Sequence, residues 1–168
     1  CSFEHYELDK TGRYQVWYEV DPTDADNPRR DYWSTGNAGF ALTGMAHAPA
    51  DYPTAIEPLG VKGNCVKLVT RDTGSFGNTV KMPIAAGNLF IGEFRVNQAM
   101  LSPRRATRFG LQLVGGRPLR FEGYYKYKAG TVFTRQQKTG APRTARHGRH
   151  LRRTLRLSLI HISEPTRP

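Results

Sequence analysis

The chain has 168 residues, of which 38% are hydrophobic and 11% aromatic, with 17 Gly, 11 Pro and 2 Cys. This length suits one domain with a sizeable core, and two cysteines are too few for a disulfide framework. The apolar runs stay well below the roughly 20 residues that a transmembrane helix needs, which excludes a membrane-spanning helix.

The formal net charge of +11 would by itself suggest a nucleic-acid partner. The charge is concentrated at one end, because residues 143–168 hold seven Arg and a single acid, Glu164. Without that segment the 25 basic and 14 acidic residues fall to 18 and 13, which leaves a net charge of +5. We therefore expect no nucleic-acid partner.

The C-terminal segment resembles translated sequencing adapter over residues 157–168. Its first eleven residues, LSLIHISEPTR, match the in-frame translation of a transposase-type adapter, and such read-through is set aside in fold reasoning. Residues 143–156 lack apolar periodicity. They are either a disordered basic tail that binds anions or a frameshifted segment, since a shift of one base permits the strand-like sequence DIYAALY. We expect the frameshift, with the C-terminal strand lost, and one domain over residues 1–142.

Alternation of apolar and polar side chains predicts four strands in the remaining chain. The first reads YQVWYEV, and the third is interrupted by Gly92, which indicates a bend or bulge. In chain order, the predicted strands cover residues 14–20, 64–70, 88–96 and 118–130.

The connecting segments are rich in turn-forming residues. Pro, Asp and Asn predict a loop over residues 21–31 and a turn-rich connection follows at residues 71–78, while residues 98–102 offer the only helical turn. Strands joined by polar loops, without helical crossovers, predict an all-β fold: a jelly-roll-like antiparallel β-sandwich.

Three blocks together resemble one family: WSTGN at residues 33–37, AGNLFIGEF at residues 86–94 and GYYKYKAG at residues 123–130. They resemble the putative carbohydrate metabolism domain (PCMD) family of bacteroidete surface proteins, over roughly residues 3–142. The resemblance implies a jelly-roll sandwich exported to the cell envelope or outside the cell, other β domains upstream, and a role in carbohydrate use. It supplies no catalytic residues. Because the chain starts at Cys1 without a signal peptide, we expect an N-terminally truncated protein.

Trp33 is the first candidate for carbohydrate binding. An indole offers a flat apolar face to a pyranose ring, and the nearby amide of Asn37 can both donate to and accept from sugar hydroxyls. The alternative is that Trp33 fills the core while Gly36 and Gly39 form a turn.

Four more residues are candidates for the same role. Tyr124 and Lys126 share one face of the fourth predicted strand, and either face of that strand can be the exposed one. Arg117 can bind sugar hydroxyls or a uronic carboxylate, or it can pair with an acid at a sheet edge. Asn88 can contact a ligand or form a turn.

Catalysis and metal binding find weaker support. Glycoside hydrolysis needs two carboxylates about 5–5.5 Å apart for retention or about 6.5–9.5 Å apart for inversion, and Glu93 and Glu122 are weak candidates for that pair. We expect no metal site and no cofactor, because the His and Cys spacing is not that of a zinc site. Calcium could use the oxygens of residues 21–27, DPTDADN, but a solvated acidic loop explains them as well.

These features predict a glycan-binding module of a bacterial cell-envelope protein, with a polysaccharide or oligosaccharide as partner. One alternative is a glycoside hydrolase that uses Glu93 and Glu122. Another is a structural or adhesion β-sandwich, which the burial of every aromatic ring would favour.

Overall fold

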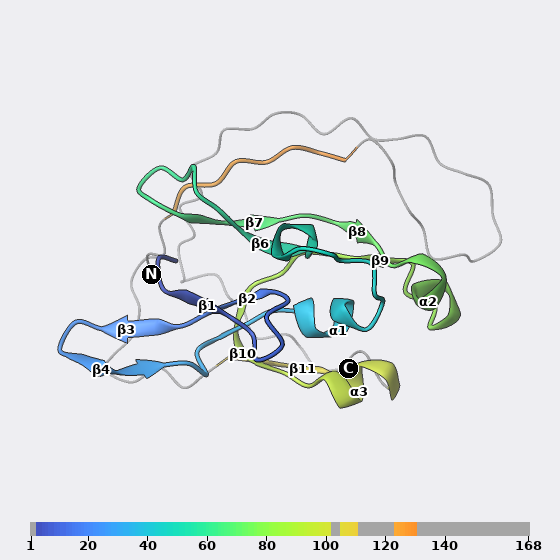
Figure 1. Cartoon of the computed structure of the whole chain (residues 1–168), viewed down its shortest axis with the longest axis horizontal. Helices are drawn as coiled ribbons and strands as arrows, with labels where there is room; N and C mark the ends of the chain where they lie inside the picture. The colour runs from blue at the N-terminus through green and yellow to red at the C-terminus, as the bar shows by residue number, and fades with distance from the viewer. Residues whose placement is uncertain (1–2, 102–104, 111–122, 131–168) are drawn as a thin grey trace, which may run out of the picture. The chain divides into compact units, whose positions relative to one another are not determined.

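The computed structural model describes residues 3–101, 105–110 and 123–130 and divides the chain into two compact units, Cys1–Leu111 and Gln112–Pro168. The described helices and strands all belong to the first unit (Figure 1). No described helix is long and apolar enough to cross a membrane. In chain order the elements are β1 (Tyr6–Leu8), β2 (Gln15–Trp17), β3 (Glu19–Asp21), β4 (Asp24–Arg29), β5 (Trp33–Ser34), α1 (Asn37–Ala41), η1 (Pro49–Asp51), β6 (Thr54–Glu57), β7 (Cys65–Leu68), β8 (Arg71–Asp72), α2 (Gly74–Thr79), β9 (Ile84–Ala85), β10 (Phe90–Phe94), α3 (Val96–Leu101) and β11 (Thr107–Phe109).

The described strands pair antiparallel in small sheets. One sheet has three strands in the order β11-β10-β5, and four others are two-stranded: β1-β2, β3-β4, β6-β7 and β8-β9. The described helices have at most six residues, so strands dominate the architecture. This confirms the all-β fold, while the jelly-roll arrangement of the sheets and the loss of a C-terminal strand stay predictions.

The strand predicted over residues 14–20 is two strands in the structure. β2 pairs with β1 and β3 pairs with β4, so the chain changes partner at Tyr18. The loop prediction for residues 21–31 is wrong, because this segment contains β4 and turns at Pro22 and Thr23. Figure 1 shows β3 and β4 as a hairpin at the left. An almost wholly exposed ribbon needs no apolar alternation, which explains why its polar sequence resembled a loop.

The strands predicted over residues 64–70 and 88–96 are confirmed as β7 and β10. The bend expected at Gly92 is present: its φ of +138° favours glycine, and a Cβ there would collide with the carbonyl oxygen of Arg108 in β11. The helical turn expected near residues 98–102 lies in α3. The sequence analysis missed α1 and α2, each a single short helix beside glycines.

The fourth predicted strand covers residues 118–130, of which the structure describes Gly123–Gly130, in the second unit. No strand is assigned to these eight residues, so the strand prediction is wrong there. Tyr124, Tyr125 and Tyr127 are all exposed, and the expected division into a buried and an exposed face is therefore not seen in this part of the chain.

The core of the first unit is small and aromatic. Trp17 on β2 is 1% exposed and Phe40 on α1 is 4% exposed. The ring of Tyr52, just before β6, packs edge-on against Phe40, with centroids 5.8 Å apart, and tilted against Tyr14 at 5.2 Å. The core thus forms where β2, α1 and the start of β6 meet, and Trp17 is its buried indole.

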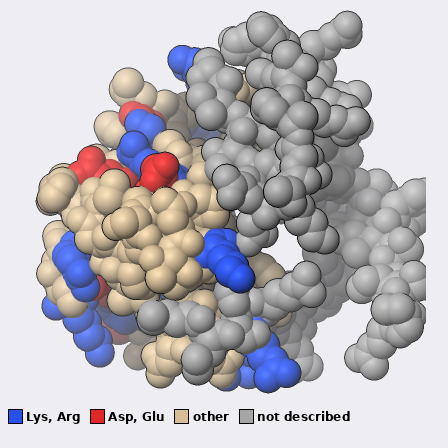
Figure 2. Space-filling view, turned by 90° about the vertical axis from the view of Figure 1, so that its right-hand side faces the viewer, with Lys and Arg blue, Asp and Glu red and all other residues tan. Residues whose placement is uncertain are grey.

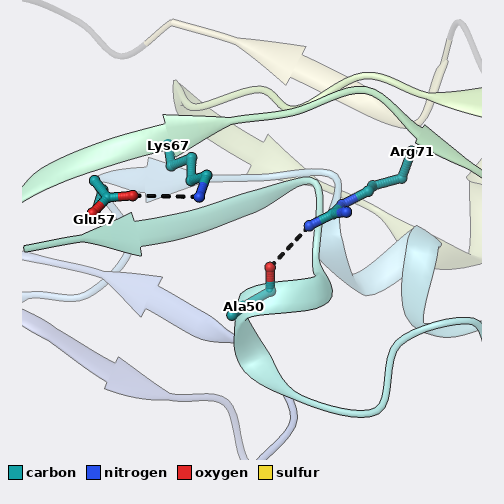
Figure 3. Close-up of polar contacts among 4 residues, drawn as sticks. All are labelled: Ala50, Glu57, Lys67 and Arg71. Atoms are coloured by element: carbon teal, nitrogen blue, oxygen red, sulfur yellow. Dashed lines mark hydrogen bonds and ion pairs between the residues drawn. The ribbon is translucent and has the colours of Figure 1, made fainter.

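Some charged side chains tie elements to one another. Lys67 Nζ lies 3.3 Å from Glu57 Oε2 across β6 and β7, and Arg71 Nη2 donates to the Ala50 carbonyl oxygen in η1 at 3.1 Å (Figure 3). In the upper left of the face shown in Figure 2, basic side chains lie beside acidic ones.

Candidate functional site

A pocket of about 170 Å³ lies between β2, β5, the start of α1 and the end of β10. Four aromatic residues line it: Tyr14, Trp17, Trp33 and Phe94. Trp17 is fully buried, whereas the other three are half-buried, so the pocket reaches from the aromatic core to the surface.

Trp33 is held in place from several sides. Its indole Nε1 donates a hydrogen bond to Glu19 Oε1 at 2.6 Å. Its ring centroid lies 5.2 Å from that of Tyr32, edge-on, and 5.7 Å from that of Phe3. Trp33 is a half-buried wall of a pocket and not a buried core side chain, so the core alternative does not describe it, and its role in sugar binding stays a prediction. An indole fixed in this way loses little conformational freedom when a ligand binds.

Three of the lining residues carry hydroxyl groups. Ser34 and Thr35 follow Trp33 in the chain, and both line the pocket, beside the apolar Val16 and Ala38. Thr35 Oγ1 accepts the backbone N–H of Asn37 at 3.3 Å, which leaves its own O–H free to donate.

The phenol of Tyr14 is the third hydroxyl group at the pocket. Burial raises the pKa of Tyr14 above its ordinary value, and the negative charge of Asp9 raises it further. The hydroxyl therefore stays protonated at neutral pH and can both donate and accept a hydrogen bond.

Asn37 lies in the chain between the lining residues Thr35 and Ala38 and is fully buried. Its Nδ2 donates to the Thr54 carbonyl oxygen at 2.7 Å, and its Oδ1 accepts the Thr54 N–H at 3.1 Å. A buried amide bonded at both ends has no surface to offer a ligand, so the prediction that Asn37 contacts a sugar does not hold. Its role is to join α1 to β6.

Asn88, in the segment before β10, also forms hydrogen bonds with Thr54. Its backbone N–H donates to Thr54 Oγ1 at 3.0 Å, and the Thr54 hydroxyl in turn donates to the Asn88 carbonyl oxygen at 2.8 Å. Its side-chain Oδ1 accepts the Gly36 N–H at 2.7 Å. Of the two roles considered for Asn88, the geometry fits the turn-forming one, with the side chain fixing the turn that follows Thr35.

The remaining candidates do not gather at the pocket within the described residues. Glu93 is exposed and paired with Arg95, at 2.8 Å between Nη2 and Oε2, and the hydrogen bond from Arg95 lowers the pKa of Glu93. Tyr124 is 82% exposed and Lys126 is exposed too, both in the second unit. Glu122 and Arg117 lie outside the described residues.

The acidic segment considered for calcium is engaged locally. Asp21 Oδ1 accepts both the N–H and the hydroxyl of Thr23, at 2.8 and 2.7 Å, and Asp24 Oδ1 accepts Asn27 Nδ2 at 2.8 Å. Among the residues that the structure describes, no three His, Cys, Asp or Glu side chains gather closely enough to hold a metal ion.

Comparison with known proteins identifies relatives of the chain. A family model described as putative carbohydrate metabolism domain, PCMD, matches residues 2–148. A crystal structure of a putative glycoside hydrolase from Bacteroides vulgatus ATCC 8482 is 41% identical, with a TM-score of 0.70, over 92% of this chain and 55% of its own. Another, from Bacteroides thetaiotaomicron VPI-5482, is 44% identical, with a TM-score of 0.66, over 77% of this chain and 36% of its own. The chain therefore spans little more than half of one relative and about a third of the other. No curated protein matches.

Proposed function

Because the chain belongs to the putative carbohydrate metabolism domain family, we propose that its first unit binds a glycan in the aromatic pocket. The observation that carries this proposal is Trp33, whose indole is fixed by Glu19 on a pocket wall that continues into the hydroxyls of Ser34 and Thr35. The family match indicates a role in carbohydrate metabolism, and glycan binding by this pocket is our proposal for that role.

The chemistry of the pocket suits a sugar. A pyranose presents C–H groups on its faces, which pack on aromatic rings with about 1 kcal/mol of attraction beyond area burial. Its hydroxyls need partners that donate and accept, which Ser34, Thr35 and Tyr14 are. A combination of apolar walls and a few hydroxyl groups is typical of small-ligand pockets.

A glycoside hydrolase is the second candidate, because both solved relatives are described as putative glycoside hydrolases. The described lining of the pocket contains no carboxylate, whereas hydrolysis needs two. Glu93 has a lowered pKa, and a general acid needs a raised one. These observations favour glycan binding over hydrolysis. If the chain were a hydrolase that uses Glu93, it would release reducing sugar from a polysaccharide, and Glu93→Gln would abolish that release. A structural or adhesion module would bind no glycan.

The wider context of the module is part of the proposal. We place it in the cell envelope or outside the cell, beside other β domains, and this fits relatives whose chains extend well beyond the matched part. The exposed Tyr124 and Lys126 remain proposed glycan contacts of the second unit.

Affinity electrophoresis of the whole chain through gels that contain different plant and host polysaccharides tests the proposal. We expect at least one glycan to retard the band, and we expect Trp33→Ala to abolish the retardation. Ala38→Leu narrows the pocket without removing the hydrogen bonds of Trp33, so it should abolish retardation as well.

The matched control is Phe109→Ala, which removes an aromatic ring that is 73% exposed and lies outside the described pocket lining. It should leave retardation unchanged, and thermal unfolding should confirm that all three variants are folded. Retardation by no glycan, or retardation that survives both pocket variants, would refute binding at this site.

A further inference from the structure

We infer that the pocket takes a single uncharged pyranose, as the terminal residue of a glycan. This inference rests on the proposed function and adds to it the size, charge and position of the sugar. Three features of the pocket carry it: its volume, the absence of charge among its described lining residues, and the buried indole of Trp17.

The volume fits one ring. A cavity of about 150 Å³ holds one benzene molecule, and pockets for drug-sized ligands start at about 300 Å³. At about 170 Å³, this pocket has room for one six-membered ring and not for two. The aromatic walls, among them Trp33 and Phe94, match the C–H faces of such a ring.

The charges around the pocket disfavour an acidic sugar. The described lining residues are all uncharged, and the carboxylate of Glu19 accepts the indole N–H of the lining residue Trp33 at 2.6 Å. Two basic residues next to the lining in sequence have partners outside it: Arg13 Nε donates to Thr11 Oγ1 at 2.8 Å, and Arg95 pairs with Glu93. A uronate would therefore lose water on entering an uncharged lining and meet the negative charge of Glu19.

The pocket also favours a chain end. Trp17, 1% exposed, belongs to both the core and the pocket lining, so it closes the inner side of the pocket. A terminal residue carries one glycosidic bond, which can point outward through the opening. An internal residue carries two, and both would have to leave through the same opening.

The test uses sugars that differ at one position. Titration calorimetry compares methyl glycosides of the gluco, galacto and manno series, each with a methyl, a hydroxymethyl or a carboxylate group at carbon 5. We expect one series to bind, with its uronate at least about tenfold weaker than the two uncharged members. Lengthening the glycan at its reducing end should change Kd by less than about threefold, because the pocket holds only the terminal ring.

Glu19→Gln probes the electrostatic part of the argument. The amide oxygen still accepts the indole N–H, but the negative charge is gone, so the uronate should gain at least about threefold relative to its uncharged partner. Equal or tighter uronate binding by the unmodified chain would overturn the inference, as would an affinity that rises steadily with chain length.

The outcomes separate this inference from the proposed function. If polysaccharides retard the chain and Ala38→Leu abolishes the retardation, but no monosaccharide glycoside binds, the terminal-residue inference is wrong and glycan binding at the pocket stands. If neither polysaccharide nor glycoside binds, both are wrong.

Discussion

Replacing Asn37 with alanine should destabilise the first unit strongly, although the residue lies outside any strand. The side chain is fully buried and forms two hydrogen bonds with the backbone of Thr54, at 2.7 and 3.1 Å. Thr54 is itself 0% exposed, so water cannot replace the amide. Each buried backbone group left unpaired costs about 1–3 kcal/mol, and the two together give a loss of about 2–6 kcal/mol. A domain of this size is stable by only about 5–15 kcal/mol.

Urea denaturation, followed by tryptophan fluorescence, measures this loss as a change in the free energy of unfolding. Asn97→Ala is the matched control, because it removes the same amide from an exposed position of α3. The control should stay within about 0.5 kcal/mol of the unmodified chain. A loss at Asn37 that is no larger than the loss at Asn97 would refute the view that the Asn37 amide joins α1 to β6.

Three other changes have definite expected results. Gly92→Ala should lower the free energy of unfolding, measured in urea, by more than about 3 kcal/mol, because the new Cβ meets the Arg108 carbonyl oxygen at a φ of +138°. Gly12→Ala, at a φ of +72° in open space, should lower it by about 1 kcal/mol, and similar losses for the two variants would contradict the clash. Burial raises the pKa of Asp9, but hydrogen bonds from Thr11, Arg13 and Tyr14 outweigh it and lower the pKa overall. The Asp9 carboxylate therefore stabilises the fold fully above its unfolded pKa of about 3.9, and this contribution is lost as the pH falls through the lower folded pKa. Asp9→Asn should make the free energy of unfolding fall less steeply with decreasing pH in this acidic range. An unchanged pH dependence would contradict the lowered pKa. Deletion of residues 143–168 should leave affinity for any retarding glycan unchanged, since we expect this segment to lie largely outside the domain; gels at two salt concentrations would expose a contribution from its Arg side chains.

The sequence predicted the fold best where a strand has an apolar pattern of its own. β7 and β10 lie where the alternation placed them, and the bend at Gly92 is real because only glycine avoids the carbonyl of Arg108. The hairpin of β3 and β4 was missed because exposed strands need no apolar alternation. In β2 the alternation located the strand but not its buried face: Gln15 and Trp17 are buried, while Val16 is half-buried.

The sequence identified Trp33 as a candidate site residue, but it did not predict which residues surround Trp33 in the fold. Trp33 stands out in the sequence as an indole among small polar residues, but the hydrogen bond that fixes it comes from Glu19, fourteen residues earlier. The contact of Asn37 with Thr54 spans seventeen positions, and that of Asn88 with Gly36 spans fifty-two. Hydrogen-bond partners this distant follow from tertiary packing and leave no periodic signal in a single sequence.

One short segment therefore serves two roles that experiments can separate. Within WSTGN, Trp33, Ser34 and Thr35 line the pocket, whereas Asn37 bonds to the backbone of Thr54 at the start of β6. Wall variants should raise the Kd of the molecules that remain folded, whatever their effect on the free energy of unfolding. The Asn37 variant should do the reverse: it should lower the folded fraction, and the folded molecules that remain should bind with unchanged Kd. The contrary result would be a raised Kd for Asn37→Ala at a temperature where the chain is fully folded. In that case the Asn37–Thr54 contact and the pocket wall would be coupled, and the position of Trp33 would depend on the contact between α1 and β6.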